Sequence, residues 1–141
     1  CLFPTATPSA YHTAAPVLTD EDVATFAASD ILRSRLRLSS LRFLRFVGLA
    51  LAQDEQVVEG PNFGERCPEI CTYENHNWLR ISRVLESLHS LGLAKEATAL
   101  YSWLDRAHRN GVIGSGDAGA RAEATKSCAI WARYAPQMEI M

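Results

Sequence analysis

The sequence has no excess of positive charge and no long apolar run. Its 141 residues carry 14 Lys and Arg against 16 Asp and Glu, and the net charge of −2 gives no general attraction to nucleic acid or to an anionic membrane surface. The most apolar stretch, 36–52, is interrupted by Arg37, Arg42 and Arg45, whereas a membrane-spanning helix needs roughly 20 predominantly apolar residues. We therefore expect a soluble protein with no nucleic-acid partner and no membrane span.

Cysteine and histidine are too sparse and scattered to indicate a disulfide framework or a metal site. Among four cysteines, Cys67 and Cys71 have a spacing that metal sites use, but no second pair of ligands accompanies them. With 48% apolar residues the chain can fold without disulfides, so we expect packed thiols in a reduced, cytoplasmic protein. The sequence predicts no metal and no other cofactor.

Several catalytic signatures are also missing. The sequence has no Gly-x-Ser-x-Gly motif and no Asp-rich motif for diphosphate ionisation. Gly111, Gly114 and Gly116 lack both the lysine and the strand that a phosphate-binding loop requires. Any enzymatic activity is therefore expected to depend on shape, desolvation and one or two hydrogen bonds.

Helix signals follow one another along most of the chain. Thr19 is expected to cap a helix over 20–28, and Asp30 to cap a long helix through Val47 that Gly48 ends. Further helices are expected over 63–70, within 76–93 after a cap at Asn75 or Asn77 and with a stop at Gly92, over 94–109, and from Ser115 or Asp117 to Pro136. Apart from a short extended piece at 56–58, nothing resembles a strand ladder. The predicted fold class is all-α, a single compact domain over 1–141 with about five to six helices.

The N-terminal residues 2–16 differ from the rest. Pro4, Pro8 and Pro16 stand among small residues and predict an extended strap that lies over another part of the fold. The chain begins at Cys1 rather than at a methionine, and we expect natural residues upstream of it.

The helix expected over 30–47 is apolar on two sides. Leu32, Leu36, Phe43 and Val47 define one face, and the other face contains Ile31, Leu38 and Leu41. A helix with this pattern is expected to be buried or to line a cavity. Its five arginines point in several directions, which favours long stems reaching water or acidic partners over a nucleic-acid-binding patch.

The helix within 76–93 has one apolar and one cationic stripe. At 100° per residue, five apolar side chains share a face, namely Ile81, Val84, Leu85, Leu88 and Leu91. Beside them, His76, Arg80, Arg83 and Ser87 line up along a polar stripe. The helix is therefore expected to bury its apolar stripe in the core and to leave its cationic stripe accessible beside it.

This helix also carries a family resemblance. Two segments carry it, namely Arg80-Ile81-Ser82-Arg83 and Ser87-Leu88-His89-Ser90-Leu91-Gly92-Leu93. They resemble the conserved N-terminal domain of the opioid growth factor receptor family. Agreement with this family is weaker at Leu2-Phe3-Pro4 and over 16–19. The similarity spans roughly 2–97, and the compact form is similar to small fungal and bacterial members. The resemblance implies the helical fold, but the receptor's C-terminal repeats are absent, so opioid peptide binding is not transferred.

Two functions are compatible with these features. The first is a small-molecule-binding protein, or a cofactor-independent enzyme of the cyclase, isomerase or pericyclase type, acting on an apolar metabolite. In such a site Arg80 or Arg83 would polarise an acceptor oxygen while His76 or Tyr73 transfers a proton. The substrate would contact Trp78, Phe43, Trp103 and Tyr101. Each of these residues also has a structural alternative, as an ion-pair partner, a helix-start residue or a core aromatic.

The second function is a receptor-like or regulatory interaction module that binds a peptide or a partner protein. A homodimer is compatible with either function. An enclosed apolar cavity of about 300 Å³ or more, reached from solvent and touched by His76, Arg80 or the helix over 36–47, would favour the small-molecule hypothesis. A solid core with an exposed apolar groove would favour the interaction module.

Overall fold

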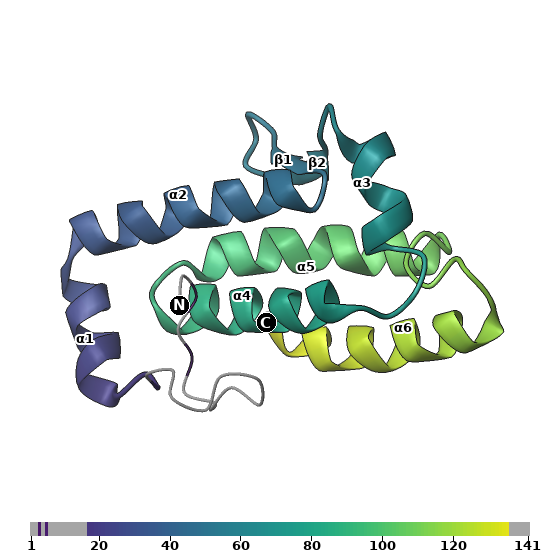
Figure 1. The fold of residues 1–141 in the computed structure, drawn as a ribbon. Coiled ribbons are helices and arrows are strands. Elements are labelled where there is room, and N and C mark those ends of the chain that lie inside the picture. Colours follow the sequence, from purple (N-terminus) through teal and green to yellow (C-terminus); the bar gives the residue numbers. More distant parts are fainter. Residues whose placement is uncertain (1–2, 4, 6–16, 136–141) are drawn as a thin grey trace, which may run out of the picture.

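The computed structural model describes Phe3, Thr5 and residues 17–135, and within them the all-α class is confirmed. Figure 1 shows the order of the elements: α1 (Asp20–Ala28), α2 (Asp30–Phe46), β1 (Leu49–Leu51), β2 (Val57–Glu59), α3 (Phe63–Ile70), α4 (His76–Ser90), α5 (Ala94–Arg109) and α6 (Ala118–Trp131), followed by a 3-10 turn (Ala132–Tyr134). Most of the predicted N-terminal strap, including Pro4, Pro8 and Pro16, lies outside the described residues.

Most predicted helix ends are confirmed, and two are corrected. Thr19 forms the expected capping box with Asp22 at the start of α1. The N-cap of α2 is Ser29 rather than Asp30, because Ser29 has extended backbone geometry and its hydroxyl accepts the Leu32 N–H at 3.2 Å. The α6 helix ends at Trp131, short of Pro136, which lies outside the described residues.

The corner between α1 and α2 is fastened by Arg33. Its guanidinium donates to the last carbonyls of α1, at Phe26 and Ala27, and pairs with Asp30. These carbonyls form the negative end of the α1 dipole, so the arginine charge stabilises the end of that helix.

A short antiparallel hairpin was not predicted. β1 and β2 pair in register from Leu49 opposite Glu59 to Leu51 opposite Val57, although only an extended piece at 56–58 was expected. Strands of three residues are too short to show the alternation by which strands are recognised. The hairpin contributes Leu49 and Val57 to the core.

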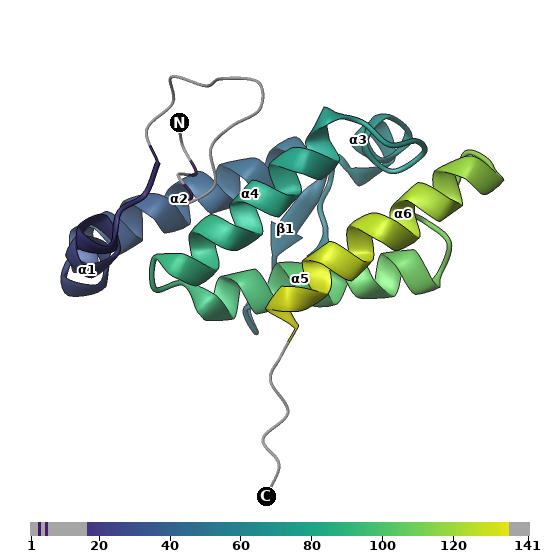
Figure 2. The same ribbon diagram turned by 90° about the horizontal axis from the view of Figure 1, so that it is seen from below.

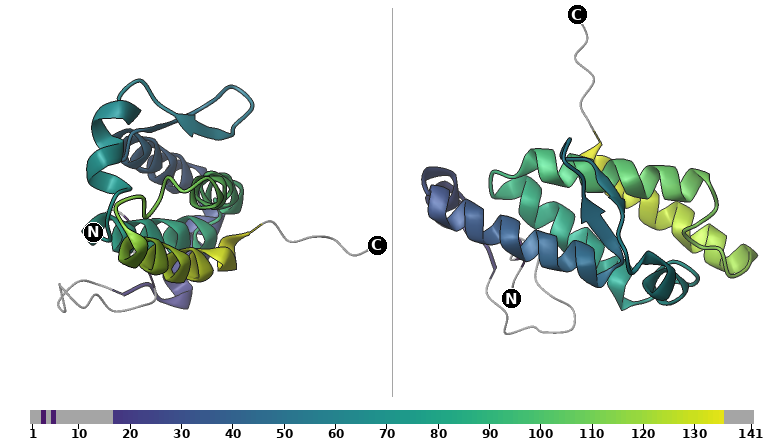
Figure 3. Two further views of the ribbon diagram at one scale, coloured as in Figure 1. Left: turned by 90° about the vertical axis from the view of Figure 1, so that its right-hand side faces the viewer. Right: turned by 90° about the horizontal axis from the view of Figure 1, so that it is seen from above.

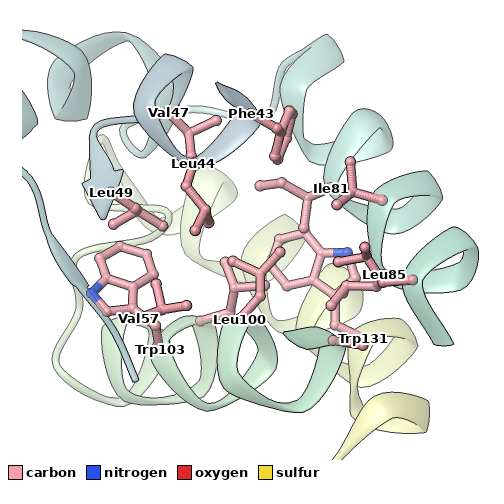
Figure 4. Close-up of a cluster of buried hydrophobic side chains, with 14 of the residues drawn as sticks. Phe43, Leu44, Val47, Leu49, Val57, Ile81, Leu85, Leu100, Trp103 and Trp131 are labelled. Atoms are coloured by element: carbon pink, nitrogen blue, oxygen red, sulfur yellow. The ribbon is translucent and has the colours of Figure 1, made fainter. Parts of the chain in front are cut away.

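The core lies around the antiparallel pair of α4 and α5. Figure 2 shows α6 running across both helices, and Figure 3 shows α2 and the hairpin on the opposite side. Figure 4 shows side chains from α2, both strands and these three helices meeting in one apolar cluster. Trp131 is completely buried there, where its indole N–H donates to the Ser82 hydroxyl at 2.8 Å.

The two apolar sides of α2 have different environments. Leu36, Phe43 and Leu44 are buried, whereas Ile31 and Leu38 are exposed. The expectation that the second side is buried or lines a cavity is therefore wrong for Ile31 and Leu38. Among residues 17–135, no helix combines the length and the apolar character needed to cross a bilayer.

Candidate functional site

An open cleft of about 440 Å³ lies between α2 and α4. Its lining combines aromatic side chains and arginines from the two helices with one residue of the N-terminal segment: Phe3, Ser39, Arg42, Phe43, Phe46, Arg80, Arg83 and Val84. The volume falls within the range of small-molecule sites in proteins.

The local sequence explains why these side chains share one space. On α2, Ser39, Arg42, Phe43 and Phe46 are spaced by three or four residues and therefore lie along one strip of the helix. Arg80, Arg83 and Val84 do the same on α4. The cleft is thus formed where two helical strips of similar composition face each other.

The floor of the cleft is apolar and mainly aromatic. Phe43 and Val84 are buried at its base. The Phe3 ring meets Phe43 edge-on with centroids 5.9 Å apart, and Phe46 lies 6.4 Å from Phe43 on the other side. Arg66, on α3, stacks over the Phe46 ring at 4.8 Å and so helps to fix its orientation. This floor provides an apolar surface on which a flat apolar group of a ligand could pack.

Three arginines line the cleft. Arg42 comes from α2, Arg80 and Arg83 come from α4, and none of the described lining residues is acidic. Arg80 Nη1 donates to Asn77 Oδ1 at 2.9 Å, which leaves most of its five N–H donors available. Within the described part of the chain, Arg42 makes no hydrogen bond or ion pair. The cleft can therefore offer charged donors to an oxygen of a ligand.

The structure brings three of the predicted site residues together, Phe43, Arg80 and Arg83. His76 lies in the first turn of α4, is exposed and does not line the cleft. Tyr73 is also exposed and packs against Gly116, where an added Cβ would come within 2.5 Å of the tyrosine Cζ. Neither of the two predicted proton-transfer groups therefore lines the cleft beside the two arginines.

The remaining predicted substrate contacts lie outside the cleft. Trp78 is buried and its indole N–H donates to the Ile70 carbonyl at 2.6 Å. Trp103 is buried edge-on against Phe63, with centroids 5.9 Å apart. Tyr101 is half-buried on α5, where burial and the Asp105 carboxylate raise the pKa of its hydroxyl. Their contacts fit the structural alternative of core aromatics better than a shared ligand site.

Sequence reasoning missed several lining residues. Ser39 and Phe46 were detectable in principle, since they lie four residues before and three residues after Phe43 on the same helix, and Arg42 lies three residues after Ser39 and four before Phe46. Phe3 gave no such signal, because a long stretch of sequence separates it from every other lining residue.

Cys67 lies in the last turn of α3, and Cys71 directly follows this helix. Among the residues that the structure describes, no three His, Cys, Asp or Glu side chains converge in a way that could hold an ion. Cys71 is buried beside Cys67, and burial together with the neighbouring thiol raises the pKa of Cys71. Both cysteines are free thiols, and Cys71 stays protonated at neutral pH.

A comparison with protein families matches most of the chain. The family model of the opioid growth factor receptor (OGFr) conserved region matches residues 1–108 of the 141. The chain belongs to this family. The OGFr match extends past the 2–97 found from sequence motifs, includes every cleft residue and reaches the last turn of α5, so α6 lies outside it. No curated protein and no solved structure matches the chain.

Proposed function

We propose that the cleft between α2 and α4 binds an apolar small molecule that carries an anionic or carbonyl oxygen. The observation behind the proposal is a lining that combines aromatic side chains with three arginines and no acidic residue. Burial of a ligand's apolar surface on the floor contributes roughly 25 cal/mol per Å². Charge-assisted hydrogen bonds from Arg42, Arg80 or Arg83 would orient its oxygen.

The size of the cleft favours a role in ligand binding over a purely structural role. Its volume exceeds about 300 Å³ and it is touched by Arg80 and by α2, as the small-molecule hypothesis requires. It is open rather than enclosed, which is the form expected for the alternative function, an interaction module. Two voids elsewhere in the core measure only about 20 and 10 Å³, which is too small for an organic ligand. A groove of about 580 Å³ beside β1 is also large enough, but Glu65 is part of its lining, whereas the cleft between α2 and α4 is lined by aromatic side chains and arginines without an acidic residue. We therefore favour the cleft as the ligand site.

The lining also narrows the chemistry that we propose. Arginine stays protonated, so it can stabilise developing negative charge but cannot accept a proton. A cyclase, isomerase or pericyclase reaction remains our proposed enzymatic activity, in a form that uses shape and guanidinium donors. His76 and Tyr73 have no part in this form because they do not line the cleft.

The binding proposal can be tested with 2-naphthoate as an aromatic anion and 2-naphthylmethanol as its neutral analogue. We expect naphthoate to bind more tightly and to shift the amide NMR signals of Phe43 and Val84. Arg80→Gln should weaken naphthoate binding by about tenfold, the effect of losing one charge-assisted hydrogen bond, and should leave the melting temperature unchanged. Arg121→Gln, at an exposed position of α6, is the matched control.

A second pair of variants tests the space itself. Ser39→Trp should fill the cleft and abolish binding of both compounds, whereas Ser34→Trp, exposed on the same helix, should bind them normally. Equal affinities for naphthoate in the wild type and in Ser39→Trp would contradict the proposal, as would an Arg80→Gln variant that fails to fold. Mass spectrometry of small molecules that copurify with the protein would then identify the natural ligand.

A further inference from the structure

The side of α2 that faces away from the core is unusually apolar. Ile31 is 66% exposed, Leu38 is 58% exposed and Leu41 is 36% exposed. At 100° per residue these side chains lie on one face together with Arg35 and Arg45, and we call these five residues the outer α2 face. Figure 3 (right) shows that no described element covers this side of α2.

The outer α2 face differs from other exposed apolar residues of the fold. Leu79 on α4, Ile130 on α6 and Val58 on β2 are each the one large exposed apolar side chain of their described element. Single exposed residues of this kind are ordinary on a protein surface. Three on one helical face form a patch of the type that marks an interaction site.

The patch continues into a groove at the C-terminal end of α2. This open groove of about 580 Å³ is lined by Leu41 and Arg45 of α2, by all of β1, and by Pro61, Asn62 and Glu65. Ile31 and Leu38 lie two helical turns apart, about 10.5 Å along the axis. The combined surface is therefore long enough to receive several turns of a partner helix.

The charge of the outer α2 face indicates what kind of partner fits. Two other arginines on α2 have acidic partners within the chain: Arg33 pairs with Asp30, and Arg37 pairs with Glu55 at 3.1 Å. Arg35 and Arg45 are exposed and have no acidic partner among the described residues. A second copy of the chain would bring its own arginines into this patch, so an acidic partner is favoured.

We propose that the outer α2 face docks an acidic amphipathic helix of another protein. Apolar side chains of that helix, repeated every three or four residues, would cover Ile31, Leu38 and Leu41. Asp or Glu residues at its edges would pair with Arg35 and Arg45. This surface borders the ligand cleft without coinciding with it. Ile31, Leu38 and Arg35 do not line the cleft, whereas Arg42, which lies between the outer α2 face and the cleft strip, does.

The probe for this proposal is a synthetic amphipathic helix with leucines along one face and glutamates beside them. The control peptide has lysines in place of the glutamates. Fluorescence anisotropy should show binding of the glutamate peptide that weakens as salt is raised, and no comparable binding of the lysine peptide. Leu38→Ser should weaken binding by at least about tenfold, as expected for an interface anchor.

Matched variants distinguish specific docking on the outer α2 face from nonspecific hydrophobic binding. Leu79→Ser, which changes an exposed leucine on α4, should bind the glutamate peptide normally. The double variant Arg35→Glu, Arg45→Glu should prefer the lysine peptide. The proposal is overturned if neither peptide binds, if Leu38→Ser binds as tightly as the wild type, or if sedimentation shows a dimer that Leu38→Ser dissociates.

Discussion

Helices α2 and α4 both have broad apolar faces, but they use them differently. On α4 the leucines and isoleucine of the apolar stripe are buried against α5 and α6, and the flanking arginines reach the cleft together with Val84. On α2 one side is buried, a second strip lines the cleft and a third faces solvent. The comparison shows that apolar content alone does not separate residues that hold a fold together from residues available to a ligand or a partner.

The largest expected effect comes from the same substitution made on each helix. Leu85→Ala on α4 removes a side chain with no exposed area and should lower the free energy of unfolding by about 2–5 kcal/mol. Leu38→Ala on α2 should change it by less than about 0.5 kcal/mol, since the side chain is mostly exposed. Chemical denaturation measures both, and equal losses would erase the distinction between the two helices.

A smaller effect is expected where the loop after α5 meets α6. Gly114 has a φ of 79°, and an added Cβ would lie 2.6 Å from the Ala120 carbonyl oxygen and 2.7 Å from the Ala124 Cβ. Gly114→Ala should therefore cost about 1–3 kcal/mol beyond the backbone strain, which is the usual range for overpacking.

The matched control is Gly111→Ala. Gly111 has a similar φ of 72°, but nothing lies within 4 Å of its added Cβ, so this change measures the strain alone, about 1 kcal/mol. Thermal denaturation of the two variants would separate strain from steric overlap. Identical losses of stability would show that α6 moves aside for the methyl group.

The smallest effect is a pH dependence of the α5 and α6 interface. Burial, assisted by the Asp105 carboxylate, raises the pKa of the Cys128 thiol from 9.0 to about 11. Because the unfolded chain loses this proton first, stability is full below pH 9.0 and falls as pH rises toward about 11. Cys128→Ala should flatten this part of the profile, measured by denaturation at each pH. If Cys128→Ala leaves the slope unchanged, the loss of stability at high pH comes from other groups, such as Tyr134, because burial raises the pKa of that tyrosine as well.

The helical part of the fold could be predicted from sequence because its signals are local. Thr19 and Asn75 cap helices through side chains two or three residues from the amides they bind, and the helix over 94–109 has the predicted bounds. Ser29 and Asp30 are both good caps, so the choice between them depended on where the chain turns between α1 and α2. The hairpin was missed since its strands are stabilised by packing on α2 and α5 rather than by a sequence pattern.

The candidate site was only partly predictable, for a different reason. Arg80 and Arg83 belong to one helical strip, and Phe43 belongs to a second strip that is apolar in sequence. Periodicity shows which residues of one helix share a face, but it does not show which helix that face meets. Trp78 and Trp103 illustrate this limit, because aromatic residues at helical spacing fit a core as well as a binding site, and the structure buries both.

The fastening of α1 by Arg33 gives Gly92 a second role besides ending α4. Gly92 has a φ of 91°, which favours glycine, and a Cβ at this position would also lie 3.0 Å from the Arg33 Cδ. The turn between α4 and α5 thus leaves a passage for the arginine stem on its way to the end of α1. In the Leu91-Gly92-Leu93 motif, glycine is therefore required for two reasons. It ends α4, and it leaves room for a side chain that comes from α2.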